Sequence, residues 1–321
     1  MSTLKPISAP LDRASELRSD EAELNRLWNA AKIIRVSDSK LATDGKSLRF
    51  LSATEVEKLI ASKIFTSGDK YFLGIDSAST VAYFAWDCDE VGKAAGDSSA
   101  EGMASLRELG AKLDEFHLGI SMHAIALSNW HRSHPHCSRC GAETESTLGG
   151  SVRVCVKDQS QHHPRTDSAV IVLVKDKDDR ILLGHQPIWP DGRFSTFAGF
   201  LEPGETFEQC VEREVFEESG VKVSEITYLG SQPWPFPASI MIAFSAVADD
   251  PSTAKADGVE ITDVRWFSRE ELKNSVADGS LLLPPTISVA RKMIAMWFGP
   301  GADKLTGGES WRYILMKFLR L

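Results

Sequence analysis

The chain lacks the features of several broad classes of protein. Only five of its 321 residues are cysteine, and no run reaches the roughly 18 apolar residues of a membrane span. The first residues carry acids where a secretory signal needs an apolar core. Positive charge is not in excess, because the net charge is -9. This charge argues against a broad nucleic-acid-binding surface. We therefore expect a cytoplasmic protein whose cysteines are metal ligands or free thiols.

Length and composition are those of a globular protein with more than one domain, at 42% hydrophobic and 25% charged residues. Residues 1–130 are predicted to form an α+β domain. Within it, Lys70–Ile75 and Val81–Trp86 are apolar runs that predict a hairpin, and Met103–Trp130 has a helical pattern with a break near Gly119. Because this region carries no recognisable chemistry, we interpret it as a scaffold or a dimerisation surface.

A group of cysteines follows this first region. Cys137 and Cys140 form a C-x2-C pair, and Cys155 follows after fourteen residues. This resembles a zinc ribbon whose fourth cysteine is missing. Asp158 stands at that place and His162 lies just beyond, and zinc accepts either side chain as a ligand. The sequence therefore predicts a structural Zn²⁺ site of three cysteines with Asp158 or His162; the alternative is a ribbon-shaped fold that has lost its metal.

Three parts follow from this division of the chain. They are an α+β domain at 1–130, a zinc-ribbon-like module at 131–165 and an α/β domain at 166–321. The two remaining cysteines, Cys88 and Cys210, are interpreted as small buried hydrophobes.

The last part has a pattern typical of a layered α/β domain. Short β-branched and apolar runs alternate with charged turns, which predicts strands, and two amphipathic segments predict helices that pack on them. The predicted strands are Ala169–Val174, Ile181–Gln186, Ile226–Leu229, Ile240–Val247 and Val264–Phe267, and the predicted helices are 207–219 and Thr286–Phe298.

The helix at 207–219 is predicted from its ends as well as from its apolar period. Thr206 and Gln209 form a capping box, and Gly220 ends the helix. On this helix Glu214, Glu217 and Glu218 are spaced i, i+3 and i+4, which brings three carboxylates to one face. They lie in the C-terminal half, where the helix dipole disfavours negative charge. A divalent cation such as Mg²⁺ or Mn²⁺ is the simplest explanation for such a face.

The segment from Gly199 to Val221, GFLEPGETFEQCVEREVFEESGV, resembles the Nudix box, Gly-x5-Glu-x7-Arg-Glu-aliphatic-x-Glu-Glu-x-Gly-aliphatic, with every defining position filled. The resemblance implies an α/β/α sandwich with a mixed sheet and the cleavage of a diphosphate. It also suggests an ion pair between Arg213 and Glu205 that braces the loop against the helix. Gly199 and Gly204 suit a tight loop that approaches a ligand or metal through its backbone.

A second motif, SQPWPFPAS at 231–239, resembles the signature of the NADH pyrophosphatase branch of this family. Its three prolines enforce a rigid extended segment with fixed aromatic side chains, a reasonable wall for a nucleotide base. The resemblance implies that Phe200 stacks on the base and that Glu260 is an additional metal ligand. The implied substrate-binding residues in the motif are Ser231, Gln232, Trp234, Phe236 and Ser239.

The resemblance implies hydrolysis of the diphosphate of NAD(H) to nicotinamide mononucleotide and AMP. Mg²⁺ or Mn²⁺ at the three helix glutamates and Glu260 would neutralise the phosphate oxygens and activate the attacking water. Glu218 is the first candidate for the general base and Glu217 the next. The branch also implies a homodimer, and it allows NAD at the 5′ end of an RNA as a substrate.

Two other functions fit the same sequence. One is hydrolysis of a different nucleoside diphosphate derivative such as ADP-ribose, which the SQPWPFPAS segment argues against. The other is a non-catalytic NAD-sensing or RNA-binding protein that uses the ribbon as its contact surface; such a sensor has no need for all the metal-binding glutamates. The final residues, Leu319–Leu321, share a basic residue and a last leucine with the peroxisomal S-K-L signal but lack its small first residue.

Overall fold

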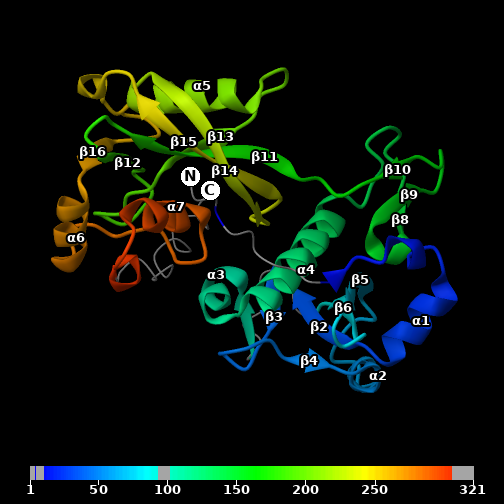
Figure 1. Ribbon diagram of the computed structural model, residues 1–321. Coiled ribbons are helices and arrows are strands. Elements are labelled where there is room, and N and C mark those ends of the chain that lie inside the picture. The colour runs from blue at the N-terminus through cyan, green and yellow to red at the C-terminus, as the bar shows by residue number, and fades with distance from the viewer. Residues whose placement is uncertain (1–3, 5–10, 93–101, 306–321) are drawn as a thin grey trace. The chain divides into compact units, whose positions relative to one another are not determined.

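A computed structural model describes residues 4, 11–92 and 102–305 (Figure 1). The C-terminal tripeptide considered as a peroxisomal signal lies outside these residues. The described residues divide into two compact units. The N-terminal unit comprises residues 11–92, 102–166 and 234–238, and the C-terminal unit comprises residues 4, 167–233 and 239–305. Among the described helices, none is long and apolar enough to cross a membrane.

The described part of the N-terminal unit contains a seven-stranded mixed sheet with the order β1-β5-β6-β2-β3-β7, to which β4 adds at β2. The predicted hairpin is confirmed, since β5 and β6 pair antiparallel. The strands are β1 (Leu11–Asp12), β2 (Lys32–Ser37), β3 (Lys40–Ala42), β4 (Phe50–Leu51), β5 (Asp69–Asp76), β6 (Ala82–Asp87) and β7 (Met103–Ser105). The helices of this unit are α1 (Glu21–Asn29), α2 (Ala53–Ala61), α3 (Leu106–Leu109) and α4 (Glu115–Ser133).

The predicted break in the helical region near Gly119 is wrong in its position. Helix α4 runs unbroken through Gly119, which is buried. The break lies earlier, where a 3₁₀ turn at Gly110–Lys112 and the extended residue Leu113 separate α3 from α4. A new helix begins there because the side chain of Asp114 caps α4 by accepting a hydrogen bond from the His117 N–H. Glycine within a helix costs only about 1 kcal/mol, which packing offsets here.

The cysteine-containing segment forms a small sheet of its own. Strands β8 (Thr144–Thr147), β9 (Val152–Cys155) and β10 (Gln161–His162) pair antiparallel in the order β10-β9-β8. The C-x2-C pair precedes β8, and Cys155 ends β9. Two separate turns therefore present the three sulfurs.

The C-terminal unit is built on a six-stranded mixed sheet in its described residues, with the order β14-β15-β11-β12-β16 and β13 paired to β11. β11 runs parallel to β15 and antiparallel to β12 and β13. The strands are β11 (Asp167–Lys175), β12 (Ile181–His185), β13 (Phe197–Phe200), β14 (Val223–Trp234), β15 (Ser239–Ala248) and β16 (Asp263–Phe267). The helices are α5 (Phe207–Ser219), α6 (Arg269–Ala277) and α7 (Val289–Phe298).

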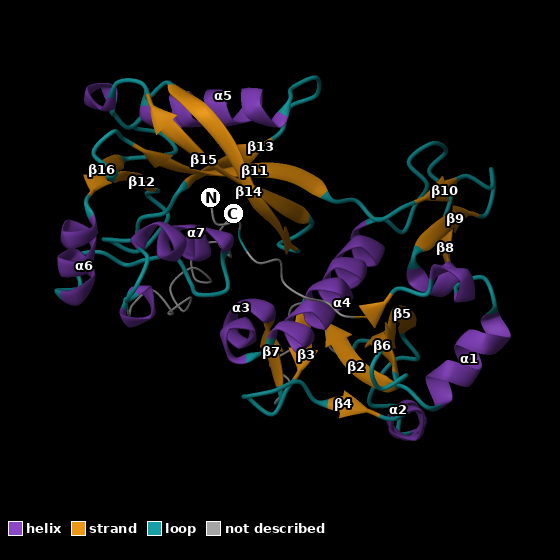
Figure 2. Cartoon of the chain, viewed as in Figure 1, coloured by secondary structure: helices purple, strands orange, loops and turns teal. Residues whose placement is uncertain are grey.

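Two helical layers cover the two faces of this sheet, α5 on one side and α7 on the other (Figure 2). Alternation along the central strand β11 explains the arrangement, since successive side chains of a strand point to opposite faces. Val170, Val172 and Val174 pack in the core cluster that contains α5 residues. Ile171 and Leu173 pack in the cluster that contains α7 residues. The unit is therefore an α/β/α sandwich with a mixed sheet, as the box resemblance implied.

Candidate active site and metal cluster

Helix α5 begins and ends where the sequence predicts. Thr206 Oγ1 accepts a hydrogen bond from the Gln209 N–H at 3.3 Å, and Gln209 Oε1 accepts one from the Thr206 N–H at 2.9 Å. At the other end Gly220 has φ 68°, a conformation that favours glycine. Because both ends are fixed, the three glutamates of the helix keep one register against the sheet.

Arg213 joins this helix to the segment before it. Its Nε and Nη2 atoms donate to the two carboxylate oxygens of Glu205 at 2.6 and 2.9 Å, so the predicted ion pair is present and bidentate. Nη1 donates to Glu214 at 2.8 Å and to Glu217 at 3.1 Å. Nη2 also donates to the Phe200 carbonyl at 3.0 Å. The hydrogen bonds from Arg213 lower the pKa of Glu205 to about 2, which keeps the brace charged at neutral pH.

The three glutamates of α5 differ greatly in exposure. Glu218 is 3% exposed, whereas the side chains of Glu214 and Glu217 are 14% and 58% exposed. Burial, followed by the negative charges of Glu260 and Glu214, raises the pKa of Glu218 to about 8. Its Oε2 atom has no hydrogen-bond partner among the described residues. An unpartnered buried oxygen costs about 1–3 kcal/mol, so this atom fits a cation that would be its missing partner.

The glycine that opens the box lies in strand β13 and not in a tight loop as predicted. A side chain at Gly199 would place its Cβ 1.8 Å from the carboxyl carbon of Glu214. The glycine is therefore needed because the Glu214 carboxylate lies directly over β13, and this burial raises the pKa of Glu214. Gly204 does lie in the loop before α5, with φ 97°, and no atom lies within 4 Å of the Cβ it lacks.

A loop after β15 adds a further acid to the site. The charge of Glu260 raises the pKa of both Glu218 and Glu214, so the structure brings it near these carboxylates. Asp257 shapes this loop by accepting hydrogen bonds from the N–H groups of Glu260 at 3.1 Å and Ile261 at 2.7 Å. The sequence reasoning missed Asp257, although the Asp-Gly pair at 257–258 is a turn signal.

A cavity of about 100 Å³ adjoins Glu218. Gln186, Trp189, Ala198 and Ile261 are among the residues that line it. The volume exceeds the roughly 15 Å³ of probe volume that one water molecule needs, so ions and water fit beside the carboxylate. The sequence reasoning missed Gln186 and Trp189, which follow the return strand β12 and have no motif signal.

Phe200 lies at the end of β13 with its backbone fixed and its ring exposed. Its carbonyl accepts the hydrogen bond from Arg213, and the residue is 58% exposed. Large apolar side chains at this exposure are available for contact with a ligand. The ring is therefore open to stacking, although no described contact tests its predicted role.

The SQPWPFPAS segment is divided between the two units. Gln232 is buried in the C-terminal unit, where its Nε2 donates to the Ile287 carbonyl at 2.7 Å. Trp234 and Phe236 belong to the N-terminal unit, with their rings edge-to-face at a centroid distance of 4.8 Å. Ser231 is exposed and Ser239 is buried. The predicted contact of these residues with a base stays a prediction.

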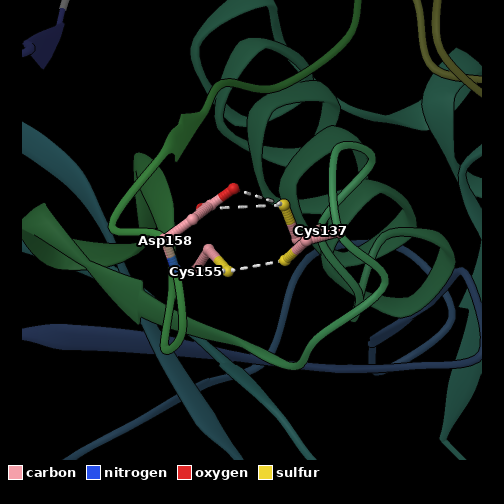
Figure 3. Close-up of side chains that lie close together, drawn as sticks. Cys137, Cys155 and Asp158 are labelled. Atoms are coloured by element: carbon pink, nitrogen blue, oxygen red, sulfur yellow. Dashed lines mark hydrogen bonds between the residues drawn. The ribbon is translucent and has the colours of Figure 1, made fainter.

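The predicted cysteines and Asp158 form one cluster in the N-terminal unit. One ligand atom from each of Cys137, Cys140, Cys155 and Asp158 lies within 4.8 Å of all the others. Figure 3 shows Cys137 and Asp158 pointing toward one another with Cys155 beside them. His162 is outside the cluster, and its Nε2 lies 3.2 Å from the Ser160 hydroxyl oxygen. Of the two alternatives for the fourth position, the geometry therefore favours Asp158.

Backbone amides stabilise the sulfur atoms of this cluster. The Arg139 N–H donates to Cys137 Sγ at 3.3 Å, and the N–H groups of Lys157 and Asp158 donate to Cys155 Sγ at 3.4 Å. A hydrogen bond with the Ser160 hydroxyl and the nearby amides lower the pKa of Cys137 to about 6. Thiolate is the form that binds metal, so the turns prepare this ligand. The two other cysteines, Cys88 and Cys210, are buried, as predicted.

The chain is similar in sequence to a known family and to several known proteins. Residues 165–284 match the NUDIX domain family model. The NAD-capped RNA hydrolase NudC of Mycobacterium bovis is 36% identical over 300 residues, which cover 89% of this chain and 92% of that protein. The NAD-capped RNA hydrolase NUDT12 of Macaca fascicularis is 40% identical over 198 residues, 58% of this chain and 43% of that protein. A solved NUDIX hydrolase from Nitrosomonas europaea is 27% identical with a TM-score of 0.37, covering 42% of this chain and 78% of that one.

The carboxylate helix, the braced loop and the sandwich around them are thus those of a Nudix hydrolase. This chain belongs to the Nudix family, in the branch to which the NudC and NUDT12 proteins belong, and the resemblance predicted from the two motifs is confirmed.

Proposed function

We propose that this protein hydrolyses the diphosphate of NAD(H) to nicotinamide mononucleotide and AMP, and that it removes NAD from the 5′ end of RNA. The observation that carries the proposal is the buried Glu218 carboxylate in an intact Nudix helix, whose Oε2 atom has no hydrogen-bond partner among the described residues. The choice of NAD is supported by the similarity to two proteins named as NAD-capped RNA hydrolases.

The donor set fits hard divalent cations such as Mg²⁺ or Mn²⁺, which take carboxylate oxygens. Glu214, Glu217, Glu218 and Glu260 would hold them, and the orphaned Oε2 of Glu218 is the strongest sign of such a ligand. Such ions, when bound, neutralise the charge of the diphosphate and lower the pKa of water.

The protein's own residues would then position and deprotonate the nucleophile. The oxygen of water forms a bond to one phosphorus, while the bond from that phosphorus to the bridging oxygen breaks. The other phosphate leaves with the bridging oxygen, and a carboxylate takes the proton of the water. We assign that proton to Glu218 first and Glu217 next. Arg213 holds the loop, the helix and the Phe200 carbonyl in one arrangement, and the exposed Phe200 ring would stack on the base.

The cysteine cluster fits a structural Zn²⁺ ion. A tetrahedral site with Zn–S bonds of about 2.3 Å needs sulfur atoms roughly 3.8 Å apart. Cys140 Sγ and Cys155 Sγ lie 3.5 Å apart, and Cys137 Sγ lies 3.9 Å from the carboxylate oxygens of Asp158. We propose these four residues as the ligands. A homodimer and a cytoplasmic location also stay predictions, which light scattering and cell fractionation test.

Product analysis tests the proposed function directly. The purified protein is incubated with NADH and Mn²⁺, and the products are identified by chromatography and mass spectrometry. AMP and reduced nicotinamide mononucleotide are expected, and Glu218→Gln should form almost none. If NADH survives while ADP-ribose is cleaved, the Nudix assignment holds and the substrate assignment fails. If neither is cleaved, the NAD-sensing alternative takes its place.

A further inference from the structure

The middle of the SQPWPFPAS segment, residues 234–238, belongs to the N-terminal unit, and we call these residues the tip of the segment. The chain enters the N-terminal unit at Trp234 and returns at Ser239. Residues 234–238 therefore pack with an N-terminal unit that carries no catalytic motif. Contacts within the N-terminal unit therefore hold these residues in place.

One side chain of helix α4 holds the backbone of this tip. Asn129 Nδ2 donates to the carbonyl of Pro235 at 3.1 Å and to the carbonyl of Pro237 at 3.0 Å. The amide is itself held, because the Ser39 hydroxyl donates to Asn129 Oδ1 at 2.7 Å. Both donor positions of the amide nitrogen are thus used on two carbonyls that flank Phe236.

A second contact fixes the ring between those carbonyls. The guanidinium of Arg107 lies 4.4 Å from the centroid of the Phe236 ring, within the range of a cation–π interaction. Phe236 also packs against the main core cluster of the N-terminal unit. Backbone and side chain of the tip are therefore held from helices α3 and α4 together.

The tip is held at the edge of a pocket and not in a closed core. A pocket of about 750 Å³ is lined by Arg107, Asn129 and residues 235–238, together with side chains from α4. This volume is within the roughly 300–1,000 Å³ typical of ligand pockets. The segment contributes apolar side chains to this pocket, and polar side chains beside them, Arg107 and Asn129 among them, come from α3 and α4.

We propose that Asn129 is a positioning residue for substrate selection: through its two hydrogen bonds the N-terminal unit sets the conformation of the SQPWPFPAS tip. The inference rests on the proposed function, because the tip matters to selection only if the enzyme acts on NAD(H). It adds a role to the first domain, which the sequence leaves as a scaffold or a dimerisation surface. Asn129 acts through the segment and does not touch the reacting atoms.

Asn129→Asp is the sharpest test, because aspartate has nearly the same size but cannot donate to the two carbonyls. We expect the KM for NADH to rise by about tenfold with kcat changed by less than about twofold, since binding geometry is lost and the chemical step is not. The kinetic constants for ADP-ribose should stay unchanged. Ser39→Ala removes only the support of the amide and should give a smaller rise in KM. Glu115→Gln, at an exposed position of the same helix, is the matched control.

Hydrogen exchange separates this inference from the proposed function. The backbone amides of Trp234, Phe236, Ala238 and Ser239 should exchange faster in Asn129→Asp than in the wild type, whichever substrate the enzyme cleaves. Unchanged exchange and unchanged KM would overturn the inference, and so would an equal loss of activity on NADH and ADP-ribose. In a further outcome, the wild type fails to cleave NADH while exchange is faster in the variant. That result would overturn the proposed function but would still show that Asn129 holds residues 234–239 in place.

Discussion

The carboxylate site on α5 and the cysteine cluster both gather anionic ligands, but they hold them in opposite ways. Glu218 is buried with an unpartnered oxygen, and burial, followed by the charges of Glu260 and Glu214, raises its pKa. At the cluster, backbone amides donate to Cys137 and Cys155, and the Ser160 hydroxyl and N–H lower the pKa of Asp158. Burial and repulsion disfavour the charged form of Glu218 in the absence of a cation. At the cluster, Cys137 and Asp158 are stabilised in their charged forms, and only Cys155 has its pKa raised, by burial, to about 11. The difference is the one expected between a reactive site and a structural one.

The largest expected effect is at the carboxylate site on α5. Glu218→Gln should lower the rate of NADH hydrolysis by about 10²–10³-fold, as the loss of a preorganised electrostatic group typically does. Glu212→Gln, at an exposed position of the same helix, is the matched control and should stay within about twofold of the wild type. Steady-state rates at saturating Mn²⁺ measure both. Equal rates for the two variants would mean that Glu218 has no special role.

The cysteine cluster should respond in metal content more than in catalysis. Asp158→Ala should weaken zinc binding by at least about 10–100-fold, measured by competition with a chelator. Asp158→Cys should bind zinc at least as well as the wild type, because it restores four thiolates. NADH hydrolysis by Asp158→Ala should fall far less than by Glu218→Gln. A similar loss in both would remove the distinction between the two sites.

The brace between the loop and the helix should show an intermediate effect. Arg213→Lys keeps the charge but loses the bidentate pairing with Glu205, so kcat/KM for NADH should fall by about tenfold. Arg26→Lys is the matched control, since Arg26 pairs with Glu23 at the surface with a side chain that is 69% exposed. If Arg213→Lys behaves like Arg26→Lys, the brace is an ordinary surface ion pair.

The smallest effect concerns pH and stability. The pKa of Glu218 is raised from 4.5 to about 8, so the folded state binds an additional proton between these values. Its contribution to stability is therefore greatest below pH 4.5 and is lost as pH rises through about 8. Urea unfolding without added Mg²⁺ or Mn²⁺ should show this decline, and Glu218→Gln should reduce it. If the free energy of unfolding falls with pH equally steeply in the wild type and in Glu218→Gln, the decline is not due to Glu218.

Local signals made much of the catalytic helix predictable. The capping box at Thr206, the end at Gly220 and the spacing of three glutamates depend on residues within one segment, so the sequence pattern was sufficient. The pairing of Arg213 with Glu205 was also expected, because the Nudix box contains both residues and the resemblance suggests an ion pair between the loop and the helix. Helix α6 was missed, although Ser268 begins it with a capping box. Its short apolar pattern gave too weak a signal.

Long-range features could not be read in this way. That Gly199 must be glycine is due to Glu214, fifteen residues later, whose carboxylate occupies the space of a side chain. The part that Asp257 plays depends on how its loop folds back on itself. The helical break was misplaced because Gly119 was judged by propensity alone, and packing outweighed it. In each case the deciding contact joins residues that no local pattern connects.

By itself the sequence determined the family, the carboxylate helix with its brace, and the three cysteines of a candidate metal cluster, because these are repeating or closely spaced patterns. Tertiary structure decided which glutamate is buried and therefore strained, which of Asp158 and His162 joins the cysteines, and which unit holds the tip of the SQPWPFPAS segment. These outcomes depend on burial and on distances between remote segments. Such quantities exist only once the chain has folded.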